Sequence, residues 1–259
     1  MYVLSALLLT PARFPAVLGD DYPAACRFLG LEPGPAGYGL VLGQDEEGAR
    51  WTVVVDDVSL VAVAIASWDC GMEYDLSPDE RTVVVSLAGW PVDLAVAAPD
   101  VPAPHDPEQG ADGTGRVPLQ PPRGDVWGPA QRRTGADEIA LQWAEWRARF
   151  TDGAGPGAAS GPDAPSAPPS HPGVRRALDE ARAYTTEGPP PPGRVRSAFA
   201  GGEARILRVD GPGWSLVART DDMAFVLLDE EPGQVRPVGR GAELPLLLEA
   251  LDRIAVRPA

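Results

Sequence analysis

The chain of 259 residues is predicted to be an α+β protein with two halves, each a mainly antiparallel β-meander covered by helices. Three observations predict this fold class. Short Val-rich runs bounded by Gly, Asp and Pro recur in both halves, as expected for strands and turns. Apolar residues at helical spacing lie beside these runs. The 29 Gly and 30 Pro residues cluster in stretches with few apolar side chains, which predicts Pro/Gly-rich linkers between the folded parts.

The first half, residues 1–100, is predicted to be an acidic α+β domain. Residues 2–9 alternate loosely and predict a strand, and two prolines limit residues 12–30 to short helices. Further strands are expected near residues 38–43, 50–56, 58–67, 81–88 and 92–98. The run SLVAVAIA at 59–66 is almost entirely apolar, which predicts a central strand covered on both faces.

Two linkers and one helix are predicted in the middle of the chain. Residues 101–134 and 151–172 hold few apolar groups and are predicted to be disordered. Between them, residues 135–150 are predicted to form an amphipathic helix. Its apolar stripe has helical spacing and consists of Ile139, Trp143, Trp146 and Phe150. Because a helix of this length is marginal alone in water, we expect it to dock on the N-terminal half.

The second half, residues 173–259, is predicted to be another α+β domain. It begins with a helix from Val174 and ends with the helix AELPLLLEALDRIA. Strands are expected near residues 194–200, 204–210, 214–220 and 223–228. The turns DGPG and TDD between them are favourable hairpin sequences.

Two stretches of the sequence resemble one another. WTVVVDDVSLV starts at Trp51, and WSLVARTDDMAFV starts at Trp214. Each has a Trp, a small hydroxyl residue, an apolar run, an Asp pair and a second apolar run. Their matching contexts support the hypothesis of two pseudo-symmetric halves that arose by duplication; the alternative is a chance likeness of two hairpins.

The charge is strongly negative and unevenly distributed. The net charge is −15, and residues 1–100 hold 15 Asp and Glu but only 4 Arg. Such a surface repels nucleic acid and anionic membranes and attracts a basic protein or cations; the alternative is that the charge serves solubility alone. No apolar run approaches the roughly 18 residues of a membrane span. We therefore expect a basic, Arg- or Lys-rich protein partner, no nucleic acid and no membrane.

Common catalytic machineries lack their residues in this sequence. The absence of Lys excludes a Walker lysine and a Schiff base. His105 and His171 lie in predicted linkers, where a catalytic triad or a zinc site has no fixed imidazole. Cys26 and Cys70 are isolated, which fits a reduced cytoplasm. We therefore expect a cytoplasmic protein that is not an enzyme, with no catalytic residue, no metal ligand and no cofactor.

Carboxylates and two tryptophans remain as candidate binding residues. If the four strands from 38 to 88 form a meander, the loops 44–49 and 68–80 share one end of the sheet, and Asp56 and Asp57 lie at the other. The acidic residues of the two loops are Asp45, Glu46, Glu47, Asp69, Glu73, Asp75, Asp79 and Glu80. Trp68 and Trp90 are expected beside turns, where an exposed Trp often marks a binding rim, although core packing is the alternative.

The leading functional prediction is a non-enzymatic cytoplasmic protein of the adaptor, chaperone or immunity-protein kind. It engages a basic partner through the acidic N-terminal half. One alternative is a carboxylate-based, metal-assisted hydrolase, which needs only Asp and Glu in the right geometry. Another is a domain that binds a small ligand in a pocket between sheet and helix.

Overall fold

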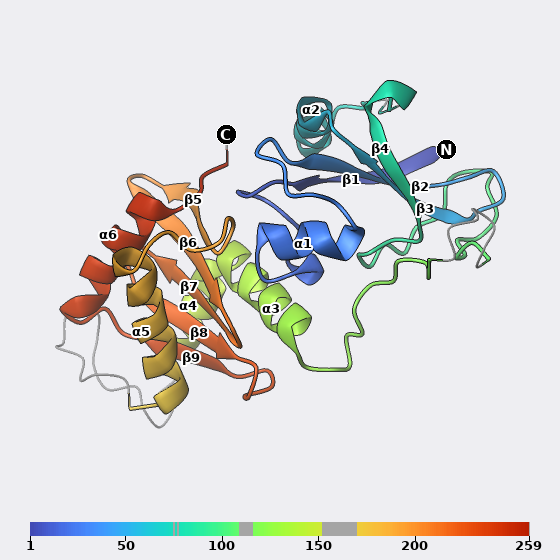
Figure 1. Cartoon of the computed structure of the whole chain (residues 1–259). Coiled ribbons are helices and arrows are strands. Elements are labelled where there is room, and N and C mark those ends of the chain that lie inside the picture. Colours follow the sequence, from blue (N-terminus) through green and yellow to red (C-terminus); the bar gives the residue numbers. More distant parts are fainter. Residues whose placement is uncertain (75, 77, 109–115, 152–169, 259) are drawn as a thin grey trace. The chain divides into compact units, whose positions relative to one another are not determined.

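The computed structural model describes residues 1–74, 76, 78–108, 116–151 and 170–258. The chain forms two compact units. The N-terminal unit consists of Met1–Leu18 and Ala25–Arg123, and the C-terminal unit of Gly19–Ala24 and Gly124–Ala259. Each unit contains an antiparallel sheet and helices (Figure 1), so the predicted α+β class with two β-meander halves is confirmed.

The described residues of the N-terminal unit form a four-stranded sheet in the order β1-β2-β3-β4. The strands are β1 (Tyr2–Leu9), β2 (Tyr38–Gln44), β3 (Arg50–Val55) and β4 (Val83–Ala88). The helical elements are η1 (Ala16–Leu18), α2 (Val58–Asp69), η2 (Glu80–Thr82) and most of α1 (Tyr22–Leu29), whose first three residues are counted with the C-terminal unit. Helix α2 packs on one face of the sheet, with Val61 and Ala64 against Ala6, Val41 and Val55 (Figure 1).

The apolar run predicted as a central strand at 58–67 is helix α2, so that prediction is wrong. Asp57 begins the helix, because its carboxylate accepts a hydrogen bond from the backbone N–H of Leu60 at 3.0 Å. An apolar run has the same appearance in a buried strand and in a helix, so its pattern could not decide between them. Residues 92–98 were also predicted as a strand and form none.

The described residues of the C-terminal unit form a five-stranded meander in the order β5-β6-β7-β8-β9. The strands are β5 (Val195–Gly201), β6 (Ala204–Gly211), β7 (Trp214–Arg219), β8 (Ala224–Leu228) and β9 (Val235–Val238), the last of which was not predicted. The helices are α3 (Pro129–Leu141), α4 (Trp143–Thr151), α5 (Pro172–Thr186) and α6 (Glu243–Ile254). Helices α5 and α6 cover one face of the sheet, while α3 and α4 cover the other (Figure 1).

The predicted helix 135–150 is divided into α3 and α4 at Gln142, and it does not dock on the N-terminal half. Ile139 and Trp143 pack instead on Val217 and Phe225 of the C-terminal sheet. The apolar stripe had to pack against a sheet, but the chain contains two sheets. The spacing of the stripe does not indicate which of them it contacts. Polar contacts select the C-terminal sheet, since Arg147 and the Trp143 indole both donate to Asp222 of the β7–β8 turn.

Parts of the first predicted linker, residues 101–134, belong to a helix or pair with the N-terminal sheet. Residues 129–134 form the first turns of α3. The backbones of His105 and Leu119 pair with Ala49 and Gly89 beside the N-terminal sheet. Composition carries no information about such backbone pairing, so the sequence did not predict these contacts. Residues 109–115 and most of the second predicted linker, 151–172, lie outside the described residues, and Pro172 already belongs to α5.

The two similar sequence stretches form different structures. The stretch at Trp51 forms strand β3 and the start of helix α2, whereas the stretch at Trp214 forms the β7–β8 hairpin. The number of strands and the order of helices also differ between the two units. The structure therefore gives no support to pseudo-symmetry between the halves.

Replacing Trp143 by Ala should destabilise the protein by roughly 3–5 kcal/mol, as large-to-small core changes do. The indole is 7% exposed and lies 5.2 Å from the Phe225 ring, centroid to centroid. Urea unfolding followed by far-UV circular dichroism measures the change. Leu141→Ala is the control on the same helix pair, because Leu141 is 86% exposed and its loss should cost less than about 0.5 kcal/mol. Equal stability of the Trp143 variant and the wild type would contradict the packing of α4 on this sheet.

Candidate functional site

The acidic turn between β2 and β3 contains one carboxylate that is hydrogen-bonded within the turn and two that are exposed. Asp45 accepts hydrogen bonds from the Trp51 indole N–H at 2.9 Å and from the backbone N–H of Glu47 and Ala49 at 3.0 and 2.9 Å. Burial acts to raise the pKa of Asp45, but these hydrogen bonds outweigh it and lower the pKa. Glu46 and Glu47 are exposed. Asp45 therefore holds the turn, and its two neighbours are available to a partner.

The predicted convergence of the two acidic loops at one end of the sheet fails for Asp79 and Glu80. Gln44 and Arg50 border the first loop at one end, whereas Asp79 and Glu80 lie at the end where Val83 pairs with Val55. Asp56 lies at that second end too, since its N–H donates to the carbonyl of Thr82. The cause is helix α2: because a helix takes the place of the third predicted strand, β4 pairs directly with β3 and starts at the end of the sheet where β3 stops.

Asp79 is engaged in local structure, but Glu80 is exposed. The Asp79 carboxylate accepts from the backbone N–H of Arg81 at 3.0 Å and pairs with the Arg81 guanidinium at 2.6 Å. The hydrogen bond from the Arg81 side chain, followed by that from its backbone, lowers the pKa of Asp79. Asp79 is thus the N-cap of η2 rather than a free carboxylate.

Three predicted binding residues do lie together, at the C-terminal end of α2. An open hollow of about 700 Å³ is lined by Trp68, Gly71, Met72, Glu73 and Tyr74. Asp69, the last residue of α2, and Glu73 after it are exposed, and Trp68 is half-buried. Asp75, the remaining predicted residue of this loop, lies outside the described residues.

Trp90 is part of the core and does not form a binding rim. Its side chain is 1% exposed, and its indole N–H donates to the carbonyl of Gly43 at 3.0 Å. The Arg50 guanidinium lies 5.3 Å from the centre of the ring. Trp90 therefore packs in the core, which was the alternative to a binding rim, because the chain after β4 folds back on the sheet.

The two histidines contact carbonyl and carboxylate oxygens. The ring nitrogens of His105 lie 2.9 and 3.1 Å from the carbonyl oxygens of Glu47 and Asp106. These hydrogen bonds, with that of Asp106 the larger cause, raise the pKa of His105. The Nε2 atom of His171 lies 3.2 Å from Glu231. Within the described residues neither imidazole is hydrogen-bonded to a Ser, Thr or Cys side chain.

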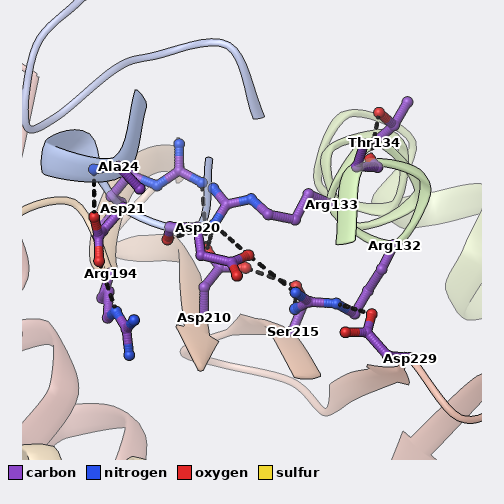
Figure 2. Close-up of polar contacts among 12 residues, drawn as sticks. Asp20, Asp21, Ala24, Arg132, Arg133, Thr134, Arg194, Asp210, Ser215 and Asp229 are labelled. Atoms are coloured by element: carbon purple, nitrogen blue, oxygen red, sulfur yellow. Dashed lines mark hydrogen bonds and ion pairs between the residues drawn. The ribbon is translucent and has the colours of Figure 1, made fainter. Parts of the chain in front are cut away.

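A group of buried charges in the C-terminal unit was not predicted from the sequence (Figure 2). Arg132 and Arg133 of α3 are 0% exposed, as are Asp210 of β6 and Ser215 of β7. Arg132 donates to Asp229 at 2.7 Å, to Ser215 at 2.7 Å and to Asp20 at 3.0 Å. Ser215 in turn donates to Asp210 at 2.6 Å. Strand β6 and the segment Gly19–Ala24 are thereby joined to α3.

Asp210 is the centre of this buried charge network. Arg133 lies 3.3 Å and Arg196 of β5 3.5 Å from its Oδ2 atom. Burial acts to raise the pKa of Asp210, but Arg133, Arg208 and Arg196 outweigh it and hold the pKa at about 2. Burial, with the charge of Arg208, lowers the pKa of Arg196 to about 10. The carboxylate is therefore ionised at neutral pH.

The network organises the fold and does not form an open binding site. Its central carboxylate and two of its arginines have no exposed surface, and the charges pair with one another. The sequence contained a signal for it, since Arg208 and Asp210 alternate with Leu207 and Val209 on β6. That pattern is typical of a strand with one solvated face. Here α3 covers the face instead.

Among the described residues, no group of three or more His, Cys, Asp and Glu side chains could hold a metal ion. No helix in the described part of the chain is both long and apolar enough to cross a membrane. Comparison with protein-family models, with curated proteins and with solved structures finds no match.

We expect Asp45→Ala to cost about 1–2 kcal/mol of stability, because it leaves an indole N–H and two backbone amides without their acceptor. Glu46→Ala, one residue away, should change stability by less than about 0.5 kcal/mol. Because the folded-state pKa of Asp45 is lowered, its contribution is present above the unfolded pKa and is lost as the pH falls through the folded pKa. Thermal melts of both variants at pH 7 and pH 3 measure the effect; equal losses for the two variants would refute the structural role of Asp45.

Asp210→Asn should be far more damaging, costing roughly 3–5 kcal/mol, because it leaves the buried arginines without their central counter-charge. With a folded pKa of about 2, the stabilisation from Asp210 is present above its ordinary pKa of about 3.9 and is lost as the pH falls toward 2. The control is Asp221→Asn, which removes the surface pair with Arg219 and should cost under about 1 kcal/mol. Urea unfolding measures both variants, and a loss at Asp210 as small as that at Asp221 would contradict the network.

Proposed function

We propose that the chain is a non-enzymatic cytoplasmic binding protein whose N-terminal unit engages a basic protein partner. The observation that carries this proposal is the difference in charge pairing between the two units. The N-terminal unit holds 16 Asp and Glu but 6 Arg, whereas the C-terminal unit holds 21 and 16. A partner that supplies positive charge would complement the first unit far more than the second.

The ion pairs of the C-terminal unit support this contrast. Five of its surface arginines pair with carboxylates of the same unit: Arg176 with Glu230, Arg182 with Glu243, Arg219 with Asp221, Arg236 with Glu231, and Arg257 with Asp252. In the N-terminal unit, Arg50 and Arg81 pair with Asp106 and Asp79. Among the described residues, no arginine forms an ion pair with the exposed Glu46, Glu47, Asp69, Glu73 or Glu80.

The sign of the charge favours a protein over a nucleic acid as the partner. Phosphate backbones bind through Lys and Arg and would be repelled by the exposed carboxylates of the N-terminal unit. Complementary charge also steers association and suppresses wrong partners, which is what an adaptor, chaperone or immunity protein requires. The proposals of a metal-assisted hydrolase and of a small-ligand domain have no comparable observation in their favour.

Capture from the native cell followed by rate measurements tests this proposal. The test variant carries Glu46→Gln, Glu47→Gln, Asp69→Asn and Glu73→Gln. A basic protein captured by the wild type should associate with this variant at least about tenfold more slowly at low salt, because electrostatic steering is lost. Stopped-flow fluorescence measures the rate, and raising the salt concentration should bring the wild-type rate down to that of the variant.

The matched control neutralises four exposed carboxylates of the C-terminal unit, namely Glu138, Glu187, Glu203 and Glu249. It removes the same net charge from the chain but not from the proposed surface, so its association rate should stay close to that of the wild type. Equal association rates for the test variant and the wild type, or capture of acidic proteins only, would overturn the proposal.

A further inference from the structure

Helix α2 has a second apolar face that the N-terminal unit does not cover. Its sequence VSLVAVAIASWD has no charged residue between Asp57 and Asp69. Val61, Ala64 and Ser67 are buried toward the sheet. The opposite face is exposed and consists of Ser59, Val63, Ala66 and Cys70, at the spacing i, i+4, i+7 and i+11. A helix that is apolar all round is typical of one that is covered on both faces.

A second exposed apolar side chain lies just past the end of the helix. Val63 is 51% exposed, and Met72 is 59% exposed. Met72 lines the open hollow together with Trp68 and Tyr74. Met and aromatic side chains at a surface hollow are suited to contact with apolar and long flexible side chains of a partner.

Small side chains make this face suited to another helix. Ser59 and Ala66 add little bulk above the backbone of α2, and Ala62 beside them is only partly exposed. The distance between two packed helices is set by the side chains at their contact, so small residues permit a close approach. An incoming helix would place apolar side chains on Val63 and Ala66.

The charges around this face identify the kind of partner. Residues 51–80 hold seven Asp and Glu and no Arg. Asp56 is exposed beside the start of α2, and Asp69 and Glu73 are exposed at its end. The last turn of α2 contains no basic residue, so the negative end of the helix dipole adds to these carboxylates. The 12 residues Val58–Asp69 span about 18 Å of helix.

The same charges argue against a second copy of the chain as the occupant. Two α2 faces in contact would bring the acidic residues of one copy close to those of the other, in a chain with a net charge of −15. Like charges brought together at an interface cost free energy. An apolar face bordered by cations has no such penalty.

We propose that the exposed face of α2 binds an amphipathic basic helix of a partner protein. The apolar side chains of that helix pack on Val63 and Ala66, and an Arg or Lys side chain enters the hollow beside Trp68 and Glu73. An aromatic ring and a carboxylate together attract a cation, the ring through its face and the carboxylate through its charge. This assignment rests on the proposed function, and it specifies where and how the basic partner docks.

Cys70 provides a direct reporter of this face. Of the two cysteines of the chain, Cys70 is exposed and Cys26 is buried. The probe is a synthetic 16-residue helical peptide with Leu on one face and Arg on both flanks. At a peptide concentration ten times its Kd, reaction of Cys70 with a maleimide should slow by about tenfold, because only about one protein molecule in eleven remains unoccupied. A peptide with Glu in place of each Arg should give no protection.

Variants of α2 then test the apolar contact separately from the charge. Val63→Asn combined with Met72→Gln should weaken binding of the Arg peptide by at least about tenfold, which corresponds to 1.4 kcal/mol. The matched control is Leu141→Asn combined with Leu246→Gln, two exposed leucines of the C-terminal unit. Its Kd should equal that of the wild type. Circular dichroism and thermal melts confirm that each variant is folded.

The outcomes separate this inference from the proposed function. If the Val63/Met72 variant binds the peptide as tightly as the wild type, or if bound peptide leaves Cys70 reactive, the α2 assignment fails while an acidic binding surface remains. If the variant with Asp69→Asn and Glu73→Gln binds the Arg peptide undiminished, or if the Glu peptide binds equally well, the proposed function fails as well. A dimer detected by sedimentation and abolished by the Val63/Met72 change would assign the face to a second copy and overturn the inference.

Discussion

The ionised carboxylate of Asp210 constrains the whole C-terminal unit, because a charge removed from water must be neutralised by groups at fixed positions. Its partners come from different elements: Arg133 from α3, Arg196 from β5, and Ser215 from β7. Neutralising the charge therefore requires α3 to lie on this face of the sheet. Once α3 is in place, the apolar stripe of α3 and α4 covers Val217 and Phe225. The buried ion pairs and the apolar contacts therefore both require α3 to lie on this face of the sheet.

The two units deal with charge in opposite ways. In the C-terminal unit, arginines and carboxylates pair with one another, both in the interior and on the surface. In the N-terminal unit, Asp45 and Asp79 are used to shape the chain, while Glu46, Asp69 and Glu73 remain exposed. The first arrangement stabilises a fold and leaves little charge for a partner. The second leaves a negative surface, and it is on this unit that the binding proposals rest.

Helix α2 connects the errors of the sequence prediction with the functional proposal. Its apolar run predicted a strand covered on both faces, and the expectation of burial on two sides was physically reasonable. The structure provides a cover for Val61 and Ala64 but none for Val63. The helix also reverses the end of the sheet at which Asp79 and Glu80 lie, which separates them from the turn at Glu46. This one change of secondary structure thus removed Asp79 and Glu80 from the predicted acidic cluster and left Val63 exposed.

The sequence by itself determined the α+β class, most strands, the terminal helix and the excess of acid in the first half, because these depend on local spacing and composition. It also showed that Ile139 and Trp143 had to be covered. Tertiary structure decided which sheet covers them, whether Trp90 lies inside or at the surface, and which carboxylates are free. These outcomes depend on contacts between residues far apart in the chain, such as Arg132 with Asp229 or Trp90 with Gly43. Local patterns are the same whichever distant partner a residue meets, so only the folded chain distinguishes them.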